Sequence, residues 1–214
     1  MSPKLGQTPS QTVGPFFSMR LGGTGQNVIA APAEGGERIM VTGRVLDGAR
    51  VPVEDALLEF WQAHPIGRYH HPDDIRPDDI RPDDIRPDDI RPDDKGEPLF
   101  DPSFTGFARA MTDFESGVWR LETVKPGRLP DPEGALQAPH ISVIVQARGT
   151  LNPVFTRIYL SDEEEANRDD LILRQAPRER RHTLIANLVP GSSPKLYEFD
   201  IKFQGEDETV FFDF

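Results

Sequence analysis

The sequence predicts an all-β protein: a β-sandwich of mixed topology with a long N-terminal arm, one short helix and a surface loop built from a repeat. Three observations predict this class. The 214 residues include 21 Pro and 18 Gly, which favour short strands and turns over long helices. Apolar and polar residues alternate over short stretches, as they do in strands with one buried face. A single acidic stretch has the pattern of a helix with acids in its first turn.

Eight short stretches supply the strands of this sandwich. They are residues 39–46, 56–61, 106–112, 117–124, 140–148, 154–160, 182–189 and 196–204. The turn at 113–116, Asp-Phe-Glu-Ser, predicts a hairpin between the third and fourth of them. The helix is expected at 162–173, with Ser161 or Asp162 as its N-cap. Residues 1–38 have little periodicity and predict an extended arm, so one domain is expected to span 39–214.

A tandem repeat interrupts this domain at 72–94. The unit Pro-Asp-Asp-Ile-Arg occurs four times, followed by Pro-Asp-Asp. Its ten Asp and four Arg give a net charge of −6, which is half of the −12 of the whole chain. Pro at every fifth position blocks a helix, and one Ile per unit cannot form a core face. We therefore expect a solvated surface loop; calcium binding and partner binding are alternatives, although calcium loops also need Gly for tight turns.

The composition excludes several classes of protein. There is no Cys, which excludes disulfides, thiolate metal sites and a Cys nucleophile. The acidic net charge of −12 argues against a general nucleic-acid binder. No apolar run approaches the ~20 residues of a membrane span, and the first residues lack the apolar stretch of a signal peptide. A soluble, cytoplasmic protein is the expectation.

His140 and Ser142 form the most informative pair in the chain. They lie in the predicted strand that begins at 140, where residues i and i+2 point to the same face. Two histidines at these positions would make a platform for a metal ion, because imidazole binds iron, zinc and copper well. A neutral hydroxyl is a poor ligand, so the strand has the shape of a metal site without its second ligand. His140 is then either a remaining ligand or a hydrogen-bonded structural histidine.

Tyr69 is the second candidate ligand. It belongs to the run Arg-Tyr-His-His at 68–71, which follows a predicted strand and leads into the repeat. Tyr69 is either a phenolate ligand of a ferric ion or an amphipathic residue at the rim of the sandwich. His70 and His71 diverge on an extended backbone, so they rarely share a metal ion. No Gly-x-Ser-x-Gly elbow, phosphate-binding Gly loop or His-Glu-x-x-His helix is present.

Several runs of residues, in order along nearly the whole chain, resemble the intradiol ring-cleavage dioxygenases. These runs are residues 8–16, 58–63, 67–69, 124–127, 138–141, 157–160, 197–201 and 205–214. The last two are similar to the iron-free subunit of a two-subunit member of the family. The resemblance implies a hetero-oligomer in which a partner subunit of the same family binds Fe(III).

The resemblance also assigns the residues of the candidate metal site. Catalytic subunits of the family hold a non-haem ferric ion with two Tyr and two His. Tyr69 matches the first tyrosine and His140 the first histidine. Leu129 falls where the second tyrosine is expected, and Ser142 replaces the second histidine. Gln137 stands where an arginine is expected, so the resemblance implies a vestigial site that holds no metal.

A contribution to the partner's active site is implied for four other residues. In the two-subunit member of the family, the iron-free subunit supplies one wall of the partner's active site. The resemblance assigns this wall to Thr12, Gly14 and Pro15 in the arm and to Arg148 at the end of the His140 strand. The resemblance implies that the substrates are dioxygen and a catechol that carries a carboxylate. The planar guanidinium of Arg148 suits a carboxylate. Gly14 allows close approach of the backbone, and Pro15 stiffens the turn.

Two other functions remain open from the sequence. The chain is a ferric dioxygenase by itself, using Tyr69, His140 and one of His70 and His71, or it is a non-catalytic β-sandwich binding module of an unrelated pathway. A red, iron-replete and active single chain would favour the first alternative. Failure to co-purify with an iron-binding relative would favour the second.

Overall fold

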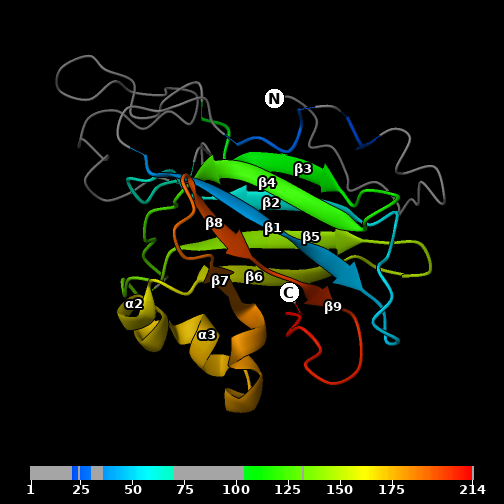
Figure 1. Cartoon of the computed structure of the whole chain (residues 1–214). Coiled ribbons are helices and arrows are strands. Elements are labelled where there is room, and N and C mark those ends of the chain that lie inside the picture. The colour runs from blue at the N-terminus through cyan, green and yellow to red at the C-terminus, as the bar shows by residue number, and fades with distance from the viewer. Residues whose placement is uncertain (1–20, 24, 30–35, 70–103, 132, 214) are drawn as a thin grey trace, which may run out of the picture.

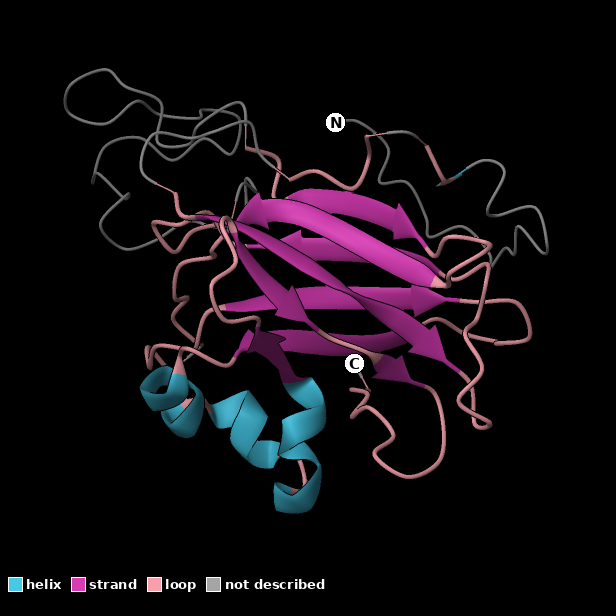
Figure 2. Cartoon of the chain, viewed as in Figure 1, coloured by secondary structure: helices cyan, strands magenta, loops and turns pink. Residues whose placement is uncertain are grey.

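The computed structural model describes residues 21–23, 25–29, 36–69, 104–131 and 133–213. The repeat at 72–94 and the predicted wall residues Thr12, Gly14 and Pro15 lie outside the described residues, as do His70 and His71. Strands dominate the described part, and the helices gather on one side of the strands (Figure 2). No helix in these described ranges is long and apolar enough to cross a membrane.

Nine strands in the described ranges form the body of the molecule. They are β1 (Arg38–Leu46), β2 (Leu57–Gln62), β3 (Phe107–Met111), β4 (Val118–Val124), β5 (His140–Gln146), β6 (Val154–Leu160), β7 (Ile185–Leu188), β8 (Lys195–Glu198) and β9 (Ile201–Lys202). One layer has the order β3-β2-β5-β6, and the other contains β4, β1 and β8. β7 pairs with both β6 and β8 and so joins the layers.

The two layers pack face to face as a β-sandwich. In Figure 1, β4, β1 and β8 run obliquely in front of β2, β5 and β6. The β6–β7, β1–β8 and β1–β9 pairs are parallel and the remaining pairs are antiparallel. The predicted all-β fold of mixed topology is therefore confirmed.

Alternation of apolar and polar residues positions each layer on the core. In β4, Trp119 and Leu121 are fully buried, whereas Arg120 and Glu122 are exposed. The ring of Trp119 meets Phe60 of the other layer at a centroid distance of 5.4 Å. Tilted aromatic pairs of this kind add to the stabilisation from burial. The strand at 117–124 is thus half-buried, as its sequence predicts.

The predicted hairpin around 113–116 is wrong. The turn itself forms, since the Asp113 amide donates to Val118 O at 3.0 Å. The two strands then separate, because β3 pairs with β2 and β4 pairs with β1. The small apolar residues of β3, such as Ala108, and the large ones of β4, such as Trp119, face the core from opposite layers. The apolar pattern fixes which side of a strand is buried, and it does not fix the neighbouring strand.

The predicted helix at 162–173 is two short helices, α2 (Glu164–Asp169) and α3 (Leu171–Gln175). The break is at Asp170, which has an extended backbone with φ −64° and ψ 122°. Its buried carboxylate caps α3 by accepting from Leu173 N at 2.7 Å. The N-cap of α2 is Glu163, and its side chain makes no capping bond.

Two of the predicted strands depart further from their expected ranges. The first part of 182–189 belongs to a 3₁₀ helix, η3 (Arg178–Leu184), which begins after Pro177. The stretch 196–204 is divided into β8 and β9. Between them, Phe199 O approaches Gly43 so closely that a Cβ on Gly43 would lie 1.8 Å away. This contact requires glycine in β1.

Candidate functional site

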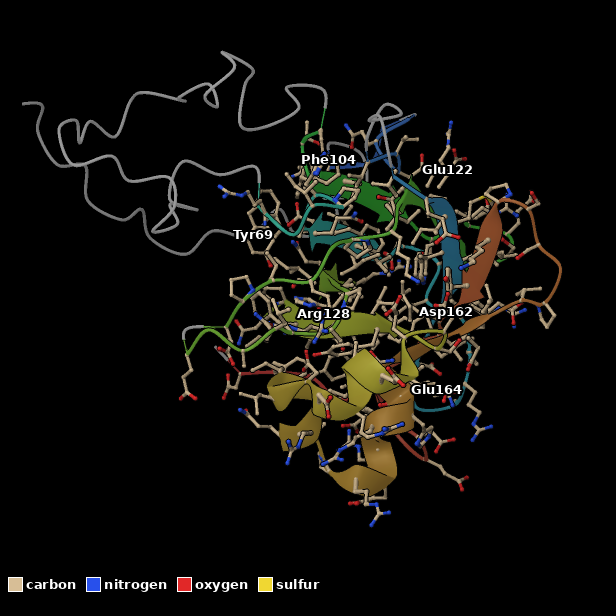
Figure 3. The ribbon with its side chains drawn as sticks, turned by 90° about the vertical axis from the view of Figure 1, so that its left-hand side faces the viewer. Tyr69, Phe104, Glu122, Arg128, Asp162 and Glu164 are labelled. Carbon is tan, nitrogen blue, oxygen red and sulfur yellow. The ribbon has the colours of Figure 1, made fainter. Side chains whose placement is uncertain are left out.

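Three of the candidate residues come together at one end of the sandwich. Tyr69 follows β2, Leu129 follows β4, and His140 opens β5. Strands β2 and β4 end, and β5 begins, at the left-hand end of the molecule in Figure 1. Figure 3 faces this end, with Tyr69 and Arg128 labelled. Segments that are far apart in sequence therefore meet where the resemblance predicts a metal site.

Backbone contacts hold these segments together. Gly67, two residues before Tyr69, has φ +78°, and a Cβ there would lie 2.2 Å from Arg128 O. Only glycine allows this approach. The Arg128 side chain donates from Nε to Gln137 O at 3.0 Å. Gln137 N donates in turn to Leu129 O at 2.8 Å. The loops that carry Tyr69 and Leu129 are thus joined to the segment that leads into β5.

Tyr69 lies on the same face of the layer as Ser142. Its ring stacks on Trp61 with a centroid distance of 5.9 Å and an interplanar angle of 25°. Trp61 is paired with Ser142 in the β2–β5 ladder, and residues that are directly opposite point to the same side of a sheet. His140 shares this side, because it lies two residues before Ser142. His140 and Ser142 thus lie on one face of β5, as the spacing predicts, and Tyr69 is on the same side of the layer.

His140 is buried and neutral at pH 7. Its side chain Nδ1 lies 2.8 Å from Ala138 O. A carbonyl oxygen only accepts, so Nδ1 donates and Nε2 keeps its lone pair. Nε2 has no hydrogen-bond partner in the described part of the chain. Burial, and then the positive charge of Arg157, lower the pKa of His140 to about 4.

Arg157 is a member of the site that the sequence analysis did not single out. It lies opposite Ser142 in the β5–β6 ladder, and its Nη1 donates to Gln137 Oε1 at 2.9 Å. The positive charge of Arg157 thus lies beside Ser142, which stands at the position of the second histidine. Its hydrogen bond holds it to Gln137, which stands where the resemblance expects an arginine. The two-residue period of the predicted strand at 154–160 puts Arg157 and Ile158 on opposite sides of that strand. The position of Arg157 opposite Ser142 depends on the register of β5 against β6, which no local run of residues specifies.

The residues at this end do not fit a ferric ion. Leu129 is an aliphatic side chain and is 5% exposed, and Ser142 offers a neutral hydroxyl in place of an imidazole. The guanidinium of Arg157 has the same sign of charge as the metal ion. Among the described residues there is no group of three or more His, Cys, Asp or Glu that could hold a metal. The interpretation of Tyr69, Leu129, His140 and Ser142 as a vestigial site remains a prediction.

A second candidate region lies at the other end of β5. Arg148 follows the strand and is about 26 Å from His140 at the usual rise of a β-strand. Its side chain is 67% exposed, and Nε is 3.0 Å from Oδ2 of the buried Asp55. Within the described ranges, no contact uses its Nη nitrogens. The ion pair therefore orients the guanidinium while its terminal donors face solvent; the role of Arg148 in a substrate pocket stays a prediction.

Comparison with known proteins identifies the family. Residues 13–97 match the family described as "Dioxygenase". The chain is 40% identical to the protocatechuate 3,4-dioxygenase alpha chain of Burkholderia cepacia over 221 aligned positions, covering 98% of both proteins. It belongs to the protocatechuate 3,4-dioxygenase alpha-chain family. The corresponding alpha chain of Pseudomonas putida is 35% identical, again over 98% of both proteins. This membership excludes a binding module of an unrelated family.

The alpha-chain family is itself related to the beta chains. The protocatechuate 3,4-dioxygenase beta chain of Burkholderia cepacia is 33% identical over 180 positions, which cover 81% of this chain and 67% of the beta chain. Solved structures share the fold. Catechol 1,2-dioxygenase from Acinetobacter sp. ADP1 matches with a TM-score of 0.57 and 19% identity, over 82% of this chain and 55% of that one. Hydroxyquinol 1,2-dioxygenase from Pseudomonas putida DLL-E4 gives 0.53 and 19%, over 94% and 68%.

Proposed function

We propose that this chain is the iron-free alpha subunit of a protocatechuate 3,4-dioxygenase. The enzyme would cleave protocatechuate with O2 to 3-carboxy-cis,cis-muconate, a step of aromatic degradation in the β-ketoadipate pathway. The observation that carries the proposal is the 40% identity to an alpha chain over 98% of both proteins. We further propose a cytoplasmic location, which the lack of Cys favours.

The partner in this proposal is the beta subunit, in a hetero-oligomer of αβ units. The beta chain would hold the Fe(III) that the reaction needs. Three residues support the assignment of the iron to the beta chain. Leu129, Ser142 and Arg157 make this chain's own site unsuitable for a ferric ion. The same residues count against a self-sufficient ferric dioxygenase built on Tyr69 and His140.

This chain would then act on the substrate through the wall that it adds to the partner's pocket. Arg148 would donate its terminal N–H groups to the carboxylate of protocatechuate, while Asp55 holds Nε. Charge-assisted hydrogen bonds to a carboxylate are stronger than neutral ones and are directional. Arg148 would therefore select protocatechuate over catechol, which lacks the carboxylate. Thr12, Gly14 and Pro15 would complete the wall from the arm.

The proposal is tested by producing this chain alone and together with its beta chain. Iron content, the visible absorption of ferric tyrosinate and oxygen uptake with protocatechuate are measured for both preparations. We expect the chain alone to be colourless and inactive, and the complex to be red and active. An active, iron-replete single chain, or a beta chain that is fully active without this chain, would contradict the proposed division.

A further inference from the structure

A tight turn at 147–150 carries Arg148 at its corner. Ala147, the first residue of the turn, is 7% exposed and belongs to the hydrophobic core. Thr150 N donates to Ala147 O at 3.2 Å and closes the turn. Gly149 has φ +91°, as the third residue of a type II turn requires. Arg148 therefore occupies the second position of the turn, and its backbone is fixed on both sides.

The side chain of Thr150 closes the same turn a second time. Its hydroxyl donates to Ala147 O at 2.7 Å and accepts from Ala147 N at 3.3 Å. Both backbone polar groups of the residue before Arg148 are thus bound to one side chain. Valine has nearly the same shape as threonine but has no hydroxyl, so Thr150→Val would remove both of these hydrogen bonds.

A second threonine fixes Asp55, the partner of Arg148. The Thr112 hydroxyl donates to Val53 O at 2.8 Å and accepts from Ala56 N at 2.9 Å. These two backbone groups flank Asp55, and Thr112 is only 1% exposed. In Figure 1, β3 and β5 end, and β2 begins, at the right-hand end of the molecule. Each member of the ion pair is therefore held by a threonine that binds the backbone beside it.

Orientation is important at Arg148 because the charge of its side chain is already balanced. Asp55 Oδ2 lies 3.0 Å from Arg148 Nε, so the ion pair as a whole attracts a distant anion only weakly. Capture of a carboxylate then depends on direct hydrogen bonds from the Nη nitrogens, and these bonds are strong only over a narrow range of directions. An arginine side chain that moves freely has to be ordered when the ligand binds, which lowers the affinity.

We propose that Thr112 and Thr150 are positioning residues for recognition of the substrate carboxylate. They act through Asp55 and Arg148 and do not touch the substrate themselves. Their hydrogen bonds hold the guanidinium in place before the substrate arrives, so that its Nη nitrogens form a preorganised receptor for one carboxylate. This inference rests on the proposed function, in which Arg148 lines the pocket of the beta chain.

The first experiment removes the two hydroxyls in the αβ complex. KM and kcat are measured for protocatechuate and for catechol in Thr150→Val and in Thr112→Val. We expect each variant to raise KM for protocatechuate about 5-fold, the effect of having to order one side chain on binding, with little change in kcat. The constants for catechol should not change, because catechol has no carboxylate. Thr150→Ser and Thr112→Ser keep the hydroxyl and should restore KM.

Thr183 offers a matched control for loss of stability. Its hydroxyl also donates to a backbone carbonyl, Arg180 O at 2.8 Å, and accepts from a backbone amide, Val210 N at 3.2 Å. It lies in η3, among the helices on one side of the strands (Figure 2). Thr183→Val should lower the melting temperature as the other valine variants do, and leave KM for protocatechuate unchanged. An equal rise of KM in Thr183→Val would overturn the inference.

A second experiment measures the mobility of Arg148 directly and does not need the beta chain. The order parameter of the Arg148 Nε–H group is obtained from 15N relaxation in the full-length chain. We expect it to fall by about 0.2 in Thr150→Val and in Thr112→Val, towards the value of a flexible group, and to stay the same in Thr183→Val. An unchanged order parameter in both variants would overturn the inference and leave the proposed function as it is.

The kinetic outcomes also separate this inference from the proposed function. If Arg148→Ala raises KM for protocatechuate and neither Thr150→Val nor Thr112→Val does, the threonines do not position Arg148 for the substrate, although the role of Arg148 stands. If KM rises in none of the three variants, Arg148 does not line the pocket, and the proposed substrate wall fails together with the inference.

Discussion

Arg157 stands opposite Ser142 in the β5–β6 ladder and donates from Nη1 to Gln137 Oε1 at 2.9 Å. Two positions at which the chain departs from the iron-binding pattern are therefore in contact with one cation. The same charge lowers the pKa of His140, after the larger effect of burial. The altered positions act as a connected unit: a guanidinium is held where a metal ion would need negative or neutral ligands.

The first prediction concerns the pKa of His140. Arg157→Met removes the neighbouring positive charge, so the pKa should rise above its value of about 4. It should stay below the ordinary 6.5, because burial is the larger cause of the shift. NMR titration of the imidazole measures the change. Arg168→Met, on exposed α2, is the control, and an unchanged pKa in Arg157→Met would show that the two groups are not coupled.

The second prediction follows from the lowered pKa of His140. The unfolded chain binds a proton near pH 6.5, whereas the folded chain binds it near pH 4. Stability from neutral His140 is therefore present above pH 6.5 and is lost as the pH falls towards 4. The loss should amount to about 3 kcal/mol of unfolding free energy. The unfolding free energy, measured by urea unfolding at several pH values across this range, should change less with pH in His140→Gln than in the unmodified chain. In Ser142→Ala its dependence on pH should be unchanged.

The strand pattern of the sequence predicts most of the fold, because burial on one side imposes a period of two. It places Trp119 in the core and Arg120 in solvent, as the structure shows. It cannot name the neighbour of a strand, and so it assigns β3 and β4 to a hairpin although they belong to opposite layers. Asp170 illustrates a second limit: a buried carboxylate that caps a helix is indistinguishable in sequence from an exposed acid within one.

In the candidate site, too, some residues could be predicted from the sequence and others could not. Tyr69, Leu129, His140 and Ser142 could be named from the resemblance, since each lies within or next to a recognisable run of residues. Arg157 also lies in such a run, but it could not be named as a site residue, because its position opposite Ser142 depends on the register of β5 against β6. Register is set by the packing of whole strands and not by any local run.

The third prediction concerns the support of the His140 segment. The buried Asp170 carboxylate accepts from Ala138 N at 2.8 Å and from Tyr159 Oη at 3.1 Å, in addition to capping α3. Asp170→Asn replaces an acceptor with a donor that faces other donors, and should destabilise the fold by ~2–4 kcal/mol. Tyr159→Phe should cost about 1 kcal/mol. Denaturant unfolding tests both variants. Asp169→Asn, at an exposed position, is the control and should change the unfolding free energy little. A change at Asp170 as small as that of the control would contradict the hydrogen bonds described.

The fourth prediction concerns the effect of Arg157 on metal binding at the candidate site. Leu129→Tyr with Ser142→His restores the ligand types of the family beside Tyr69 and His140. We expect this double variant to bind Fe(III) poorly, because the guanidinium of Arg157 repels the ion. Adding Arg157→Gln should allow binding, seen as iron content and visible tyrosinate absorption. Equal iron binding with and without Arg157 would show that only the missing ligands exclude the metal.

The last prediction concerns the ion pair of Arg148 with Asp55. In the αβ complex, Arg148→Ala should raise KM for protocatechuate ~10-fold or more, since a charge-assisted hydrogen bond to the carboxylate is lost. The constants for catechol should not change. Asp55→Asn should raise KM for protocatechuate less, because Arg148 keeps its charge and loses only its orienting partner at 3.0 Å.

A double-mutant cycle decides how Asp55 acts. If Asp55 works only by orienting Arg148, Asp55→Asn should have no further effect on KM once Arg148 is Ala, so the two single effects should not add. Arg168→Ala on α2 controls for loss of a surface charge. Additive effects would mean that Asp55 supports the pocket by a separate route, and no effect of Arg148→Ala would remove Arg148 from the substrate wall.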